Sequence, residues 1–109
     1  MKTTLEELQA FVAVVDGGSI TAAADHLGQT VSGVSRALAR LEKKLDTTLL
    51  RRTTRRTALT EEGQAFLSRT RAILASIDDA EEHMAARRQQ PAGRLQENAA
   101  TQLKQHAAV

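Results

Sequence analysis

Arginine side chains are concentrated in one stretch of this sequence, TTLLRRTTRRTALT, which spans residues 47–60. It holds six threonines and four arginines: Arg51, Arg52, Arg55 and Arg56. Guanidinium groups this close together repel one another, so the run is favourable where it meets an anion. Arginine matches the geometry of phosphate, and threonine hydroxyls can bond to the same groups. The stretch therefore predicts a polyanion site, with a solvated charged face as the alternative.

The charge of the chain is small but unevenly distributed. The 109 residues have a formal net charge of +2. Residues 30–60 carry eight Lys or Arg against two acids, whereas residues 1–29 carry one lysine against four acids. A basic segment on a nearly neutral chain favours a nucleic-acid partner. Phe11 and Phe66 are the only aromatic residues, which argues against stacking of bases on aromatic platforms.

Other kinds of chemistry have little support in the sequence. The chain has no cysteine, and its three histidines, His26, His83 and His106, are scattered, so no metal-ligand spacing or cysteine nucleophile is present. There is no Gly-rich phosphate loop. No apolar run approaches the ~20 residues of a membrane span, and the N-terminus MKTTLEEL lacks a signal-peptide core. We expect a cytoplasmic protein that is not an enzyme and needs no cofactor.

Two helices are expected before the basic segment. Apolar residues at helical spacing predict the first over residues 5–16; they are Leu5, Leu8, Phe11, Val12 and Val15. Thr4 and Glu7 form a capping box at its start. Ser19 is the expected N-cap of a second, alanine-rich helix over residues 20–27.

The third helix combines an apolar stripe with a polar face. Thr30 is its expected N-cap, and spacings of three and four predict a stripe to about Leu45. The stripe residues are Val31, Val34, Leu38, Leu41 and Leu45. A short helix, the turn GQT and a longer helix make a helix-turn-helix pattern. Alone, this pattern also fits an ordinary helical hairpin in a bundle.

The basic stretch follows this pattern directly. Residues 47–51 and 57–60 are short and suited to strands, with RTTR as the turn between them. They predict a β-hairpin wing, with Thr54 and the arginines at its tip and edges. Such a wing can reach phosphates or enter a narrow minor groove, where arginine is favoured. Helix-turn-helix, wing and charge together predict DNA binding.

Thr60 begins a fourth helix that nothing interrupts before Pro91, about 30 residues or ~45 Å. Spacings of three and four form a heptad seam along it: Phe66, Thr70, Ile73, Ile77, Ala80 and Met84. We expect this seam to pair with the same helix of a second copy; the alternative is that it packs on the domain itself. Leu67 and Leu74 form a second line facing the domain, and Gly63 would allow close approach to the wing.

The motifs FVAVVDGGSITAAADHLG, VSRALARLEKKL and LLRRTTRRTALTEEG resemble the N-terminal DNA-binding domain of LysR-type transcriptional regulators. With the long helix, the resemblance covers roughly residues 5–95. It implies a mainly α fold: a winged helix-turn-helix of three helices and a hairpin, then a dimerising linker helix. In that family a larger α/β domain that binds a small-molecule effector follows. Here PAGRL resembles the hinge into it, but the sequence departs from the pattern at Gln96, as expected of a truncated chain with a foreign tail or of a natural short protein.

The resemblance also implies roles for individual residues. In the recognition helix, which starts near Thr30 and Val31, the residues facing the major groove would be Ser32, Gly33, Ser35 and Arg36. Gly33 stands where alanine is more usual in that family. Thr21 and Arg40 would contact phosphates. Arg52 and Arg55 match the wing arginines, with Arg51 and Arg56 as auxiliary charges.

These observations predict three parts of the chain. Residues 1–60 form the winged DNA-binding domain, residues 61–90 the dimerisation helix, and residues 91–109 a hinge and a disordered or foreign tail. The expected partners are double-stranded DNA, read as an interrupted inverted repeat, and a second copy of the chain. An effector would act only through the missing domain, and dimer against tetramer stays open for the parent. The alternative function is a helical coiled-coil interaction protein whose basic hairpin is incidental.

Overall fold

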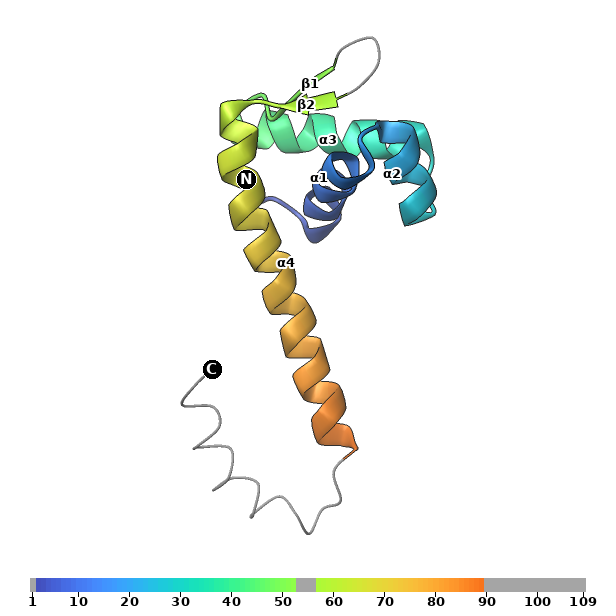
Figure 1. The fold of residues 1–109 in the computed structure, drawn as a ribbon, viewed down its shortest axis with the longest axis vertical. Helices are drawn as coiled ribbons and strands as arrows, with labels where there is room; N and C mark the ends of the chain where they lie inside the picture. The colour runs from blue at the N-terminus through green and yellow to red at the C-terminus, as the bar shows by residue number, and fades with distance from the viewer. Residues whose placement is uncertain (1, 53–56, 90–109) are drawn as a thin grey trace. The chain divides into compact units, whose positions relative to one another are not determined.

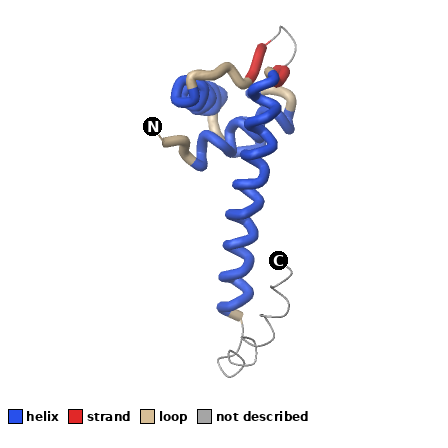
Figure 2. Tube along the Cα trace, turned by 90° about the vertical axis from the view of Figure 1, so that its left-hand side faces the viewer, coloured by secondary structure: helices blue, strands red, loops and turns tan. Residues whose placement is uncertain are grey.

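The computed structural model describes residues 2–52 and 57–89. Three helices come first, α1 (Leu5–Gly17), α2 (Ile20–Leu27) and α3 (Val31–Leu45). A hairpin of β1 (Leu50–Arg52) and β2 (Thr57–Leu59) follows, and then the long helix α4 (Glu61–Arg88). Figure 1 shows the order of these elements, and Figure 2 shows that the described chain is helical apart from the hairpin and short connections. The predicted mainly α, winged helix-turn-helix architecture is confirmed.

The core lies where α1, α2 and α3 pack on one another. Phe11 and Val14 of α1 and Val34 and Leu41 of α3 are each 0% exposed. On α2 the core is made of alanines, and Ala23 is also fully buried. Its small side chain lets the helices approach closely. The Phe11 ring also meets Phe66 of α4, with 5.7 Å between the ring centroids.

The predicted helix starts are confirmed by side-chain hydrogen bonds. The Thr4 hydroxyl accepts from Glu7 N, and the Glu7 carboxylate accepts from Thr4 N, which completes the capping box. Ser19 accepts from Ala22 N at 3.0 Å, and Thr30 caps α3 in the same way. These bonds satisfy backbone donors that a helix cannot satisfy internally.

Two apolar residues predicted for the buried stripes are exposed instead. Leu5 is 44% and Val31 48% exposed. Each is the first residue of its helix, and the core begins one turn later, at Leu8 and Val34. Periodicity defines the direction of an apolar face but not how far along the helix its neighbours reach.

The hairpin pairs antiparallel, with Leu50 opposite Leu59 and Arg52 opposite Thr57. Its first strand begins later than the predicted residue 47, because the backbone preceding it bonds elsewhere. Thr47 N donates to Glu42 O at the end of α3. Leu49 is 1% exposed, and Thr60 N donates to its carbonyl at 3.0 Å. The base of the hairpin is therefore tied to both neighbouring helices.

The described part of the chain divides into two compact units, one up to residue 75 and one from residue 76 onward, and α4 contributes to both. Leu67 of α4 belongs to the core of the first unit, as predicted for the line of residues facing the domain. Thr60 caps the helix by accepting from Gly63 N at 2.9 Å. The helix thus begins at Glu61, and the first compact unit extends along it to residue 75.

Gly63 provides the first test of this packing. A Cβ atom at this position would collide with the Leu49 carbonyl oxygen and lie 3.0 Å from Leu59 Cδ2. We expect Gly63→Ala to lower the free energy of unfolding by about 1–3 kcal/mol, as for overpacked sites, despite the better helix propensity of alanine. Thermal unfolding followed by circular dichroism measures this. Gln64→Ala, at an exposed position of the same turn, should stay within about 0.5 kcal/mol of wild type; equal stability of both variants would contradict the close packing.

Candidate nucleic-acid interface

The recognition helix α3 has one buried face and one open face. Val34, Leu38 and Leu41 are buried in the core. The residues of the open face recur every three or four positions, so they lie above one another along the helix. Exposed there are Val31, Ser32, Arg36, Ala39, Arg40 and Lys43, with Gly33 and Ser35 half-buried at its edge. Six of the seven predicted recognition-helix contacts, Val31 to Arg40, are thus brought together on one surface, which Thr30 caps.

Gly33 has a local role at the start of this helix. Its N–H donates to the Thr30 hydroxyl at 3.0 Å. A Cβ atom on Gly33 would lie 3.0 Å from that same oxygen, which is a tight contact. Glycine therefore leaves the cap undisturbed at the end of α3 where side chains would meet base edges.

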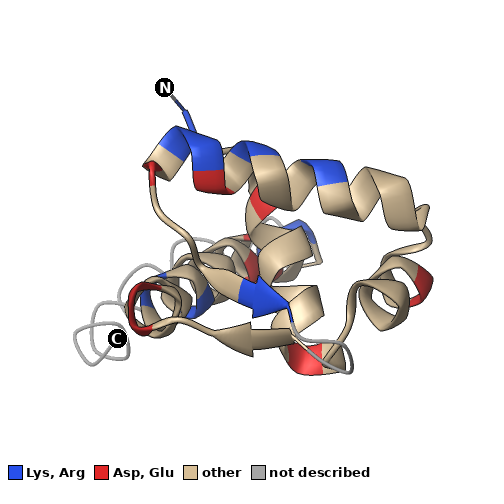
Figure 3. Ribbon diagram, turned by 90° about the horizontal axis from the view of Figure 1, so that it is seen from above, with Lys and Arg blue, Asp and Glu red and all other residues tan. Residues whose placement is uncertain are grey.

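The wing is joined to α3 by a carboxylate. Glu42 Oε2 accepts hydrogen bonds from the backbone N–H groups of Leu49, at 2.7 Å, and Leu50, at 3.1 Å. Arg52 of β1 is exposed, and its Nη2 lies 3.4 Å from Ser35 Oγ of α3. A wing arginine is thereby placed beside the open face of the recognition helix. Figure 3 shows Lys and Arg segments along α3 and on β1.

The remaining predicted contacts fall in different places. Arg51 is exposed on β1, and Thr21 is exposed in the first turn of α2. The positive end of a helix dipole favours anions there. Thr54, Arg55 and Arg56 lie outside the described residues. The described part of the wing therefore holds two of its four arginines, both exposed.

Glu7, predicted only as part of the capping box of α1, lies under the C-terminal half of α3. Glu7 is 1% exposed. Its carboxylate accepts from Lys44 Nζ at 2.8 and 3.0 Å and from Arg40 Nε at 3.2 Å. Burial raises the pKa of the Glu7 carboxyl, but hydrogen bonds from Lys44, Thr4 and Arg40 outweigh it and lower this pKa from 4.5 to about 2.

Glu7 and Glu42 are the functional residues that sequence reasoning missed. Glu42 offered a signal, since it is one of only two acids among residues 30–60, and an acid retained within a basic segment suggests a structural partner. Glu7 gave no such signal, because the capping box accounted for it completely. Its ion pairs join α1 to α3 across more than thirty residues, a separation that no local pattern reveals.

The predicted seam of α4 divides into two parts. Thr70 is 0% exposed and donates its hydroxyl to Phe66 O at 2.8 Å, while Phe66 packs against the core of the first unit. Farther along, Ile73 is 46% and Met84 54% exposed. Intramolecular packing, the alternative to pairing, thus accounts for the first two seam residues but not for these exposed ones.

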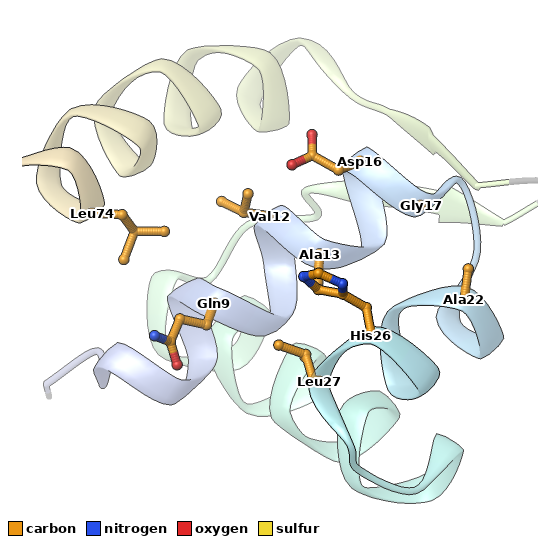
Figure 4. A pocket seen from close by; sticks show the side chains of 9 residues that line it. All are labelled: Gln9, Val12, Ala13, Asp16, Gly17, Ala22, His26, Leu27 and Leu74. Atoms are coloured by element: carbon orange, nitrogen blue, oxygen red, sulfur yellow. The ribbon is translucent and has the colours of Figure 1, made fainter. Parts of the chain in front are cut away.

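A groove of about 510 Å³ lies between α1, α2 and α4. Figure 4 shows its lining side chains, among them Val12 and Asp16 of α1, His26 and Leu27 of α2, and Leu74 of α4. Neither α3 nor the hairpin lines it. The groove is therefore separate from the basic surface, and His26 is an exposed residue at its edge.

Membrane spans and metal clusters are absent from the part of the chain that the structure describes. None of its helices combines the length and the apolar character that a membrane crossing needs. No group of three or more His, Asp or Glu side chains within those residues could hold a metal ion. The helices, the wing and the basic open face together define a winged helix-turn-helix protein.

Comparison with known proteins identifies the family within this class. Residues 5–64 match the model of the bacterial regulatory helix-turn-helix proteins of the lysR family. The chain belongs to this family. It is 44% identical over 106 residues to the HTH-type transcriptional regulator CrgA of Neisseria meningitidis, and 37% identical over 91 residues to the HTH-type transcriptional activator AaeR of Escherichia coli. These alignments cover 97% and 84% of this chain but only 36% and 29% of those proteins, so the chain spans about a third of their length.

Solved structures agree with this assignment. A crystal structure of a BenM_DBD/catB site 1 DNA complex matches with a TM-score of 0.76 and 32% identity, over 81% of this chain and 99% of that one. The structure of CrgA from Neisseria meningitidis matches with a TM-score of 0.68 and 48% identity, over 78% of this chain and 29% of that one. The resemblance found in the sequence is confirmed.

The Glu7 ion pairs predict an acid-dependent stability. The pKa of Glu7 is depressed from 4.5 to about 2 in the folded state. Its contribution to the free energy of unfolding is therefore complete above the unfolded-state pKa of 4.5 and is lost as the pH falls from there toward 2. Glu7→Gln should cost about 1–3 kcal/mol near neutral pH, as for loss of a charged hydrogen-bond partner. Its deficit relative to wild type should shrink from pH 5 toward pH 2.

Thermal unfolding at several pH values between 2 and 7 measures that deficit. Asp16→Asn is the matched control, because Asp16 of α1 also forms an ion pair with an arginine, at 2.9 Å from Arg71. Unlike Glu7, both side chains of this pair are about half exposed. Its effect should be small at every pH. A constant deficit for Glu7→Gln across the whole range would show that the carboxylate charge is not what stabilises the fold.

Proposed function

We propose that this chain is the sequence-specific, double-stranded DNA-binding part of a bacterial LysR-type transcription regulator. One observation carries the proposal: the open polar and basic face of α3 has an arginine strand fixed beside it by Glu42 and by the Arg52–Ser35 contact. Base edges in the major groove are read by side chains of this kind on an inserted helix, while flanking arginines neutralise phosphates. The match to a BenM_DBD/catB site 1 DNA complex supports it.

In this proposal the interface residues fall into two groups. Ser32, Ser35 and Arg36 read base edges, beside Thr30, Val31 and Gly33 at the start of the helix. The wing arginines, Arg40 and Thr21 hold phosphates and fix the register, since backbone contacts position a protein while base contacts specify the site. The protein acts in the cytoplasm as a regulator and not as an enzyme. Effector binding, and any tetramer, belong to a further domain of the parent protein.

The alternative of a coiled-coil interaction protein with an incidental hairpin has no comparable support. Its defining feature would be a basic hairpin without a structural relation to the helices. Instead, Glu42 holds the backbone at the start of β1 and Ser35 meets Arg52. The relatives are named as transcriptional regulators.

We also propose that residues 61–90 pair two copies of the chain. Ile73 and Met84 are exposed, as is Ala80, and Ile77 is half-buried. These four residues continue the heptad seam beyond the part that packs on the winged unit, and isolated apolar stripes of this kind favour a helical partner. A two-fold dimer would present two recognition helices to an interrupted inverted repeat. We propose residues 91–109 as hinge and tail; they lie outside the described residues.

Arg36 tests the reading of DNA sequence. A DNA site is first selected from random duplexes with the wild-type protein. Arg36→Ala should then weaken binding to the selected site about 5- to 150-fold, the equivalent of 1–3 kcal/mol for an arginine–guanine pair, with a smaller effect on unrelated duplex. Arg52→Ala is the comparison: it should weaken both equally and lower the salt slope by about 0.9, as for one phosphate contact. Fluorescence anisotropy over a salt series measures both; unchanged affinity would remove Arg36 from the interface.

Charge introduced into the seam tests the dimer. Ile73→Asp with Ile77→Asp would bury unpaired carboxylates in a paired helix, which is strongly unfavourable. The double variant should sediment as a monomer at tens of micromolar protein, keep the circular dichroism of the winged domain, and lose its preference for a full repeat over a half-site. Ala75→Asp with Ala86→Asp, two exposed positions about half a turn away around the helix, should remain dimeric. A monomeric wild-type protein would overturn the proposed pairing.

A further inference from the structure

Glu7 is a buried acid that is not among the proposed DNA contacts. It lies on α1, the helix farthest in sequence from the wing, yet its side chain is 1% exposed and faces the C-terminal half of the recognition helix. Both carboxylate oxygens are occupied: Oε1 by Thr4 N and Lys44 Nζ, and Oε2 by Arg40 Nε and Lys44 Nζ. A buried acid with this many donors holds each of them in a defined place.

The two cations that Glu7 holds are used differently. Lys44 Nζ donates to both Glu7 oxygens and also to Lys2 O at 2.8 Å. Three donor directions are all that an ammonium group has. Its side chain is only 24% exposed, so Lys44 serves the fold.

Arg40 is held at one edge only. Within the described residues its contact is through Nε, at 3.2 Å from Glu7 Oε2, and the side chain is 50% exposed. A guanidinium group is planar with five N–H donors, so fixing Nε also fixes the plane of the two Nη groups, which carry the other four. Arg40 follows Arg36 by four residues, which places it on the next turn of the same open face.

We propose that Glu7 is a positioning residue of the DNA interface: it grips the Nε edge of Arg40 and presents the Nη edge to a DNA phosphate, while it keeps Lys44 inside the fold. The inference rests on the proposed DNA binding and deepens it. Pre-orientation of a long side chain reduces the conformational entropy lost on binding. The acid therefore strengthens binding to a polyanion, although its charge alone would oppose it.

Arg40→Lys is the decisive variant, because it keeps the positive charge and leaves Glu7 with two cations. An ammonium group is a single compact charge, so it lacks the second edge with which a guanidinium group can bind a phosphate while it is bonded to Glu7. Arg40→Lys should therefore lose as much as Arg40→Ala: roughly tenfold or more in affinity for both selected and unrelated duplex, and about 0.9 in the salt slope. Arg40→Lys that binds like wild type would overturn the inference, since any mobile charge would then suffice.

Glu7→Gln provides the second arm, measured at a temperature where circular dichroism shows it folded. It should weaken DNA binding in the wild-type background and have no further effect in the Arg40→Ala background, because Glu7 acts through Arg40. Asp16→Asn changes the net charge equally at another α1–arginine pair and should leave binding unchanged or slightly stronger. Glu7→Gln that behaves like Asp16→Asn would show that only net charge matters and would overturn the inference.

These outcomes separate the inference from the proposed function. If Glu7→Gln does not fold, the comparison of Arg40→Lys with Arg40→Ala decides alone. Arg40→Ala that binds as tightly as wild type places Arg40 outside the interface, and the inference fails while DNA binding stands. Wild-type protein without salt-dependent binding to duplex DNA would instead remove the proposed function itself.

Discussion

The backbone N–H and carbonyl of Leu49 join α3, the wing and the start of α4. Its N–H donates to the Glu42 carboxylate of α3 at 2.7 Å, and its carbonyl accepts from Thr60 N at 3.0 Å, just before α4 begins. The carbonyl also lies so close to Gly63 that no larger residue fits there without movement. The recognition helix, the base of the wing and the start of the long helix are therefore fixed by one buried residue. Without this junction, the wing arginines would have no defined distance from α3.

Acidic residues organise a surface whose function depends on positive charge. Glu42 neutralises no basic side chain in the described structure; it holds two backbone N–H groups and so fixes the wing. Glu7 takes Lys44 into the fold and leaves Arg40 half exposed. In both cases a buried or half-buried carboxylate is compensated by several donors, which is the condition for an acid to be stable away from water. The net charge of this region therefore understates how specifically its cations are placed.

The long helix serves two kinds of packing along its length. Near its start, Leu67 and Thr70 are buried within the winged unit, and Phe66 contacts Phe11. Later residues of the same heptad pattern, Ile73 and Met84, are exposed. One continuous period thus passes from an intramolecular contact to an exposed apolar surface. This is why a regular heptad pattern on its own does not say which of its residues meet a partner.

The sequence by itself determined the helices, their caps and the class of protein. Thr4, Ser19 and Thr30 were assigned as caps because capping depends on residues three positions apart. For the same local reason, the Ser19 cap and the alanine-rich run gave the bounds of α2, and apolar periodicity gave those of α3. The concentration of arginine and the family motifs were sufficient to predict a winged helix-turn-helix and DNA binding.

Only the tertiary structure decided what depends on contacts distant in sequence. Glu7 lies thirty-seven residues from Lys44, so its ion pairs follow from no local pattern. Glu42 holds backbone groups seven and eight residues away, so its retention in a basic segment signalled a partner but did not identify it. The exposure of Leu5 and Val31 and the burial of Thr70 depend on where neighbouring helices end. The sequence specifies which residues can bind an anion, whereas packing of α1 and the wing against α3 decides which of them are held inside and which face outward, because a buried charge is stable only where the fold brings it a partner.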